Sequence, residues 1–131
     1  MVFAKEMLAA KKQLEELGHE AIVPLDTHDC LAKPELQCDL DWCMSQNLDK
    51  DHFNKIAGGD AVLILNYPKN NIQGYIGGSS LMELAIARYL DKKIFILHEL
   101  PNEDELRYAL EIKVMRPIIL NGDISNIKNH I

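Results

Sequence analysis

The chain has 131 residues and a formal net charge of −6, with 47% hydrophobic and 26% charged residues. This length fits one compact domain with its own core, and the composition is that of an ordinary soluble globular protein. The acidic balance argues against a nucleic-acid-binding surface, which would be basic. No apolar run reaches the roughly 18 residues of a membrane helix and no secretory signal is visible, so we expect a cytoplasmic protein that binds neither nucleic acid nor a membrane.

The three cysteines, Cys30, Cys38 and Cys43, are odd in number and do not have the Cys-x-x-Cys spacing of a zinc site. His28 and His52 lie near them in the sequence, which leaves a metal site as one interpretation. Reduced thiols in a cytoplasmic protein are the simpler interpretation. We therefore expect no bound metal and no cofactor.

The first elements are a helix and a short extended segment. Apolar residues at steps of three and four predict one buried helix face, made of Phe3, Met7, Ala10, Leu14 and Leu17. Gly18 stands where a helix commonly ends in a glycine, and residues 19–24 predict a short strand closed by Pro24. A doubly wound sheet normally begins with a strand. Either a first strand precedes this sequence, or the fold manages without it.

Residues 25–48 predict a loop followed by an irregular helix over 36–44 that contains Trp42. A connection of this length between core elements is often a lid or a binding loop. With Met44, Trp42 is a candidate to line such a lid, and anchoring of the loop in the core is the alternative. Asp49 then predicts the cap of a helix that ends at Gly58-Gly59.

The rest of the chain alternates apolar strands with helices: strand 60–66, a turn-rich loop at 68–71, a helix from the serine pair at 79–80, strand 92–97, a helix from Asn102 or Asp104 to Val114, and strand 117–120. This alternation is typical of the α/β class. We predict a Rossmann-like (flavodoxin-like) parallel sheet of about four to five strands with helices on both faces, in a single domain over residues 1–131.

Glu83 is the leading candidate for chemistry. Ser80-Leu81-Met82-Glu83 matches a capping box, which would place Glu83 in the first turn of its helix, where the peptide dipoles favour a carboxylate. In open parallel sheets, ligands bind beyond the carboxyl ends of the strands, where such helices begin. A carboxylate there could attack an anomeric carbon or stabilise the positive charge of a breaking glycosidic bond.

Several residues around Glu83 are candidate ligand-binding groups. The loop after Asn66 leads to the helix start, and Gly77 and Gly78 would let a ligand approach the backbone closely. Ser79 and Ser80, with the free amides of the first turn, could hold a sugar hydroxyl or a phosphate.

Three further residues have weaker cases. Tyr75 could stack on a base, and ordinary packing is the alternative. Asp60 opens its strand at the amino end, on the far side from the expected crevice, and capping of the preceding turn is its structural interpretation. His98 follows the carboxyl end of its strand and is well placed for a ligand, but the sequence identifies no partner for it.

The run Gly-Gly-Asp-Ala-Val-Leu-Ile-Leu-Asn at 58–66, with Gly-Gly-Ser-Ser-Leu-Met-Glu-Leu-Ala-Ile-Ala at 77–87, resembles the nucleoside 2-deoxyribosyltransferase-like family, which includes deoxynucleoside monophosphate N-glycosidases. The resemblance covers roughly residues 4–24 and 57–98. It implies that Glu83 is the nucleophile that attacks C1′ of a nucleoside or nucleotide and that Asp60 is a second catalytic residue. It also implies a homodimer or larger oligomer in which a neighbour completes the pocket.

The sequence departs from the family at several places. Gly77 stands where the transferases usually have aspartate or serine, and Gly78-Ser79-Ser80 follows where Gly-Thr or Gly-Val is usual. Ala85 replaces a helix glycine, and the family's first strand is absent. Two hypotheses follow. The first is an enzyme that hydrolyses or transfers N-glycosidic bonds through Glu83, and the second is a non-catalytic nucleotide-binding or interaction module on the same fold.

Overall fold

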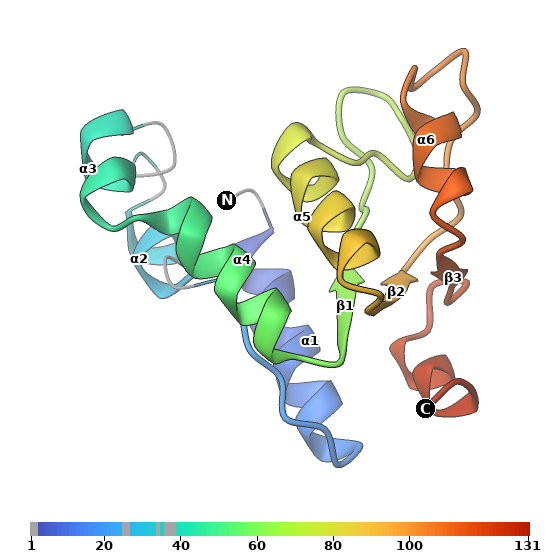
Figure 1. The fold of residues 1–131 in the computed structure, drawn as a ribbon, viewed down its shortest axis with the longest axis horizontal. Helices are drawn as coiled ribbons and strands as arrows, with labels where there is room; N and C mark the ends of the chain where they lie inside the picture. Colours follow the sequence, from blue (N-terminus) through green and yellow to red (C-terminus); the bar gives the residue numbers. More distant parts are fainter. Residues whose placement is uncertain (1–2, 25–26, 34, 36–38) are drawn as a thin grey trace. The chain divides into compact units, whose positions relative to one another are not determined.

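The computed structural model describes residues 3–24, 27–33, 35 and 39–131, and the chain forms two compact units, residues 1–55 and 56–131 (Figure 1). We call them unit 1 and unit 2 and describe each by itself. Within the described ranges, no helix is both long and apolar enough to cross a membrane.

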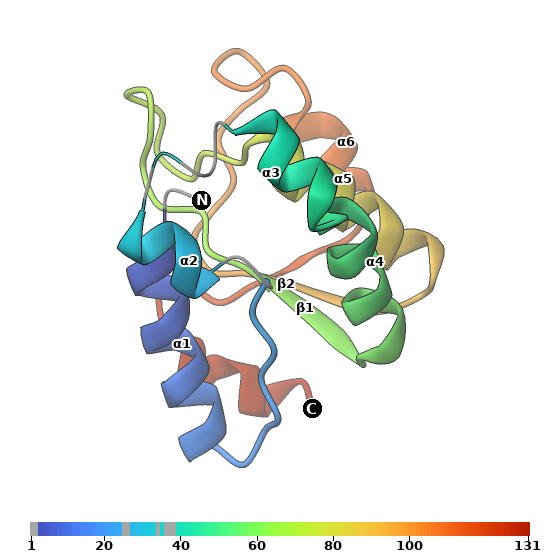
Figure 2. The same cartoon turned by 90° about the vertical axis from the view of Figure 1, so that its left-hand side faces the viewer.

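Unit 1 is helical. Its elements are α1 (Ala4–Glu16), α2 (Thr27–Ala32), α3 (Leu40–Ser45) and most of α4 (Leu48–Gly58), and α1 and α2 pack against each other (Figure 2). The predicted first helix is confirmed. Gly18 ends it with a φ of +93°, while the amides of Gly18 and His19 donate to the carbonyls of Glu15 and Leu14. This pair of bonds is a Schellman motif, which explains why glycine stands there.

The prediction of a strand at residues 19–24 is wrong. The segment pairs with no strand in the part of the chain that the structure describes, and Ile22 is 59% exposed. The Lys55 ammonium donates to the Val23 carbonyl at 3.3 Å. Strand propensity is a local property, but a strand forms only where a second strand pairs with its backbone. That pairing depends on the tertiary structure.

The segment predicted to be a loop and an irregular helix contains two short helices, α2 and α3. The Asp39 carboxylate caps α3 by accepting the Trp42 amide at 3.0 Å. Cys38 and the other residues at 25–26, 34 and 36–37 lie outside the described residues, so the predicted start of the irregular helix does too. The helix predicted to follow is confirmed as α4, but it begins at Leu48, so Asp49 lies in its first turn and does not cap it.

Unit 2 contains a parallel sheet with the strand order β1 (Ala61–Ile64), β2 (Lys93–Ile96) and β3 (Ile118–Ile119). All three predicted strands are present, each shorter than predicted. The prediction of four to five strands is wrong for the described residues, because segment 19–24 does not join the sheet. A small parallel sheet with helices is an α/β arrangement compatible with a Rossmann-like fold.

The core of unit 2 lies between the sheet and two helices, α5 (Gly78–Tyr89) and α6 (Ala109–Val114). Side chains alternate along β2, so Ile94 and Ile96 join a buried cluster with Leu84 of α5 and Ile112 of α6. Figure 1 shows α5 lying across β1 and β2, which it contacts. Phe95 points to the other face, where its ring centroid is 6.2 Å from that of His130, just after the 3-10 helix η2 (Ile124–Asn129).

The helix α6 is shorter than predicted. The Asn102 side chain accepts the Glu105 amide at 3.1 Å, which closes a turn, and the α-helix begins only at Ala109. Asn102 therefore starts a turn, because its carboxamide competes for the backbone amides that a helix would use.

Candidate site at the carboxyl edge of the sheet

The carboxyl ends of β1, β2 and β3 lie at one edge of the sheet because the three strands are parallel. Three segments leave this edge, over residues 65–77, 97–108 and 120–123. The first of them leads to the start of α5. All but one of the predicted site residues belong to this edge or to α5.

The start of α5 differs from the prediction. Gly77 is the N-cap and makes no side-chain capping bond, and Gly78 is the first helical residue. The capping box predicted for Ser80 and Glu83 is therefore wrong. The first turn of α5 contains no acidic residue, and Glu83 lies in the second turn. The helix dipole acts mainly within the first turn, so it does less for Glu83 than the sequence predicted.

Ser79, Ser80 and Glu83 nevertheless lie on the same side of α5. Residues three and four apart on a helix are neighbours, and helical side chains lean towards the N-terminus. From this rule we expect the Glu83 side chain to lean over the turn that carries the two serines, towards the carboxyl edge. Ser79 is exposed, while Ser80 and Glu83 are half-buried. This side flanks the face that buries Leu84 and Ala87 against the core.

Neither Gly77 nor Gly78 is required by the fold itself. Gly77 has φ −81° and ψ 173°, which any residue adopts. A Cβ on Gly77 would have a Tyr75 ring carbon at 3.7 Å as its neighbour, and one on Gly78 would have no heavy atom of the described chain within 4 Å. Side chains would fit at both positions, so the helix start is open to approach from outside.

The side chain of Asn66 forms hydrogen bonds across the carboxyl edge of the sheet. Its side chain is fully buried, accepts the His98 amide at 2.7 Å, and donates to the carbonyls of His98 at 2.8 Å and Gly74 at 3.3 Å. Buried amides are normally satisfied in this way. The two bonds to His98 tie the end of β1 to the end of β2, and the bond to Gly74 ties it to the loop that follows β1. Its predicted role in ligand binding stays a prediction, but these three bonds already engage its oxygen and both donor directions.

Gly74 lies where the loop after β1 approaches the segment after β2, and this close approach requires glycine. Its φ is +75°, and a Cβ at this position would lie 2.2 Å from the Glu99 carbonyl oxygen and 3.4 Å from the Asn66 amide nitrogen. No other residue type fits such an approach without moving the backbone. The sequence marked Gly74 only as part of a loop, and nothing in the local pattern identifies Glu99 as its neighbour.

Tyr75 contacts residues of two of the three segments that leave the edge, its own segment and residues 97–108. The Lys69 ammonium lies 5.8 Å from its ring centroid, a cation–π distance. The Tyr75 phenol neighbours that of Tyr108, which donates to the Ile76 carbonyl. Burial, and secondly Tyr75, raises the pKa of the Tyr108 phenol. Packing thus accounts for Tyr75, and stacking on a base stays a prediction.

Asp60 lies apart from the other candidates. It immediately precedes β1, whose register pairs Ala61 with Lys93, so it stands at the amino edge of the sheet. Asn66 lies six positions further along extended chain, which amounts to about 20 Å. This placement agrees with the far side expected from the sequence. The structure does not bring Asp60 together with the start of α5, and its catalytic role stays a prediction.

His98 lies at the carboxyl edge with neighbours that the sequence did not identify. Its ring is 5.5 Å from that of Tyr67, centroid to centroid, in an edge-to-face arrangement. Its Cε1 atom would be 3.5 Å from a Cβ on Gly122. Tyr67 and Gly122 follow β1 and β3, so the parallel order β1-β2-β3 explains why they meet His98. The sequence could have suggested this only with the strand order in hand.

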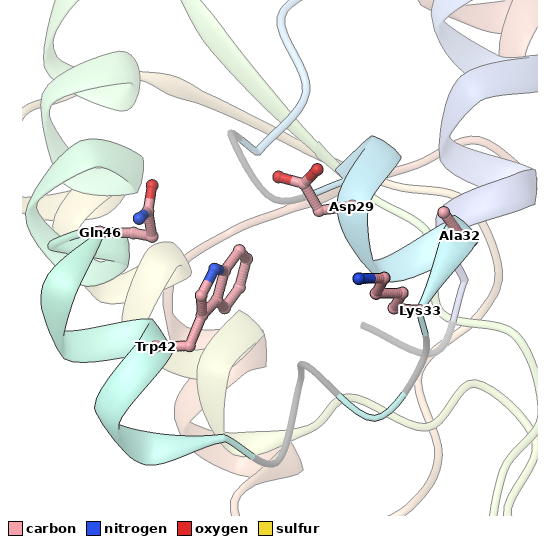
Figure 3. A pocket seen from close by; sticks show the side chains of 5 residues that line it. All are labelled: Asp29, Ala32, Lys33, Trp42 and Gln46. Carbon is pink, nitrogen blue, oxygen red and sulfur yellow. The ribbon is translucent and has the colours of Figure 1, made fainter.

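Unit 1 contains a hollow of about 480 Å³ (Figure 3). Asp29, Ala32 and Lys33 line one side, and Trp42 and Gln46 line the other. Figure 3 shows the indole of Trp42 directed into the hollow. The sequence predicted that Trp42 lines a lid or anchors a loop, and the structure places it half-buried at this hollow.

Among the described residues, no group of three or more His, Cys, Asp and Glu side chains is arranged to hold a metal ion. Comparisons with protein-family models, with curated proteins and with solved structures gave no match. The resemblance described above therefore remains a likeness of motifs at 58–66 and 77–87.

Proposed function

We propose that unit 2 is a Rossmann-like domain that acts on the N-glycosidic bond of nucleosides or their 5′-monophosphates, with Glu83 as the nucleophile. The observation that supports this proposal is the common side of α5 shared by Ser79, Ser80 and Glu83, leaning towards the carboxyl edge of a parallel sheet. Ligands of open α/β sheets bind at this edge.

The reaction would proceed in two steps. The Glu83 carboxylate attacks C1′, the C1′–N bond breaks, and its electron pair leaves with the base, which takes up a proton. Water, or the nitrogen of a second base, then displaces Glu83 from C1′. The hydroxyls of Ser79 and Ser80, with the amides at the start of α5, would hold a sugar hydroxyl or a phosphate.

Three further features belong to this proposal and come from the resemblance or from composition. These are the catalytic role of Asp60, a homodimer or larger oligomer, and a cytoplasmic location without a metal or cofactor. Of the three, the role of Asp60 has the least support, since Asp60 stands at the opposite edge of the sheet from Asn66.

A second candidate is a nucleotide-binding or interaction module without catalysis. Two of the predicted ligand groups are already engaged within the chain, Asn66 through backbone groups and Tyr75 through Lys69 and Tyr108. A fold that keeps these contacts would offer a ligand mainly the start of α5 with Gly77 and Gly78.

The test is chromatographic detection of free base after incubation with a panel of deoxynucleosides and their monophosphates. We expect Glu83→Gln to lower base release by more than roughly 10³-fold, as loss of a nucleophile does. Glu111→Gln, which changes an exposed glutamate of α6, is the matched control and should keep full activity. Undiminished release by Glu83→Gln would refute the nucleophile. Saturable nucleotide binding without release from the wild-type protein would favour the binding module.

A further inference from the structure

Residues from all three segments of the edge lie around His98. One Asn66 side chain bonds both the amide and the carbonyl of His98, at 2.7 and 2.8 Å, which fixes its backbone. The Tyr67 ring packs edge-to-face against the imidazole, 5.5 Å away. Gly122 lies beside the imidazole, where a Cβ on it would be 3.5 Å from Cε1, and the Gly122 amide donates to the Leu97 carbonyl at 2.7 Å.

This ring is half-buried, so part of it faces outward at the carboxyl edge. Among the described residues, Tyr67 packs its titratable phenol ring against it. Glu99, the next residue, is exposed. Asp123 follows Gly122, but its carboxylate accepts the amide and hydroxyl of Ser125 at 2.9 and 2.7 Å and so caps η2.

A base that leaves C1′ carries the electron pair of the broken bond and is a poor leaving group unless it is protonated. A histidine exchanges its proton in the neutral range, which suits it to this task. The other acid implied for the reaction, Asp60, lies at the amino edge. Among the predicted and observed groups at the carboxyl edge, His98 combines an ionisable side chain with a position fixed by all three post-strand segments.

We propose that His98 is the general acid that protonates the leaving base, an inference that rests on the proposed function. As the C1′–N bond breaks, a ring N–H of the imidazolium gives its proton to the base nitrogen that receives the electron pair. In the second step the neutral imidazole takes a proton from the water that attacks C1′. Glu83 leaves as a carboxylate, and His98 returns to the imidazolium.

The test compares two substrates whose leaving groups differ in their need for a proton. One is a deoxynucleoside or its monophosphate with a natural base, and the other is the corresponding 4-nitrophenyl deoxyriboside, whose phenolate leaves without protonation. We expect His98→Gln to lower kcat about 10²-fold on the natural substrate and only a few-fold on the nitrophenyl substrate. The alkaline limb of the pH profile, which reports loss of the proton that the general acid donates, should be lost with the natural base alone.

His130→Gln is the matched control, since His130 lies on the other face of the sheet, against Phe95, and should leave both rates unchanged. Thermal unfolding of each variant reports whether the fold survives. An equal loss on both substrates, or no loss on either, would overturn the role of His98 while leaving the proposed function standing. If the wild-type protein releases neither base nor nitrophenolate, both proposals fail together.

Discussion

Unit 2 buries large apolar side chains, whereas unit 1 leaves most of its own partly exposed. In unit 2, Ile94, Phe95 and Ile96 of the central strand are at most 4% exposed. In unit 1, the buried apolar residues that the structure describes are Ala4, Ala10 and Leu48, while exposed fractions reach 70% for Leu40 and 64% for Met44. The difference follows from geometry, because a central strand presents two faces that can both be covered, and a short helix presents one stripe.

Both units contain short helices, but only unit 2 packs them against a large apolar core. The helices α2 and α3 of unit 1, like α6 of unit 2, have 6 residues each, far below the length at which an isolated helix is stable in water. They depend on packing, which in unit 1 is provided by few large side chains. We infer that local stability resides in unit 2, which also contains the candidate site, so the site rests on the better packed part of the chain.

The contrast between the two units predicts that they separate in unfolding. The single tryptophan, Trp42, belongs to unit 1, and the four tyrosines belong to unit 2. We expect tryptophan fluorescence to change at lower urea than tyrosine absorbance, by roughly 1 M, which corresponds to a local stability difference of about 2 kcal/mol. Trp42→Phe should leave the tyrosine transition unchanged. Coincident transitions would mean that both units unfold as one, which would contradict the proposed difference in their stability.

A second test acts on unit 2 alone through two glycines of the same region. Gly74→Ala should lower the free energy of unfolding by about 3 kcal/mol or more, because its Cβ would lie 2.2 Å from the Glu99 carbonyl oxygen at a φ of +75°. Gly78→Ala should change it by less than about 1 kcal/mol, since alanine fits there and suits a helix. Both are measured by tyrosine-monitored urea unfolding. Equal effects would show that the junction at Gly74 adapts to a side chain.

The smallest effect concerns pH. Burial and the neighbouring Tyr75 raise the pKa of Tyr108 above its ordinary value of 10.0, so the fold favours the protonated phenol that donates to the Ile76 carbonyl. That stabilisation is complete below the unfolded pKa and is lost as pH rises through the folded pKa. At neutral pH, Tyr108→Phe should cost about 1 kcal/mol, and the cost should vanish in the alkaline range.

The control for this last test is Tyr89→Phe, because Tyr89 is 84% exposed and should contribute nothing at any pH. A Tyr108→Phe penalty that stays constant from neutral to strongly alkaline pH would contradict the hydrogen bond as its source. The measurement is the urea midpoint of each variant across that range.

The candidate site could be predicted only in part. The glycines and serines before α5, and Glu83 behind them, follow from local composition, and the structure places them on one helix. The capping box put the N-cap of this helix three residues late, at Ser80 in place of Gly77, because Ser80 and Glu83 match a pattern that the chain does not use. The partners of Asn66, Gly74 and His98 lie far away in the sequence, and no local pattern could reveal them.

Local sequence was sufficient to predict α1 with its Gly18 end, the helix α4, the three apolar strands and the α/β class, since periodicity and glycine conformation act within a few residues. Tertiary structure decided which extended segments became strands. Residues 19–24 are apolar enough for a strand but have no pairing partner in the described chain, whereas residues 118–119 pair with β2. Backbone pairing between distant segments depends on where the chain returns, and hydrophobic pattern alone does not encode that.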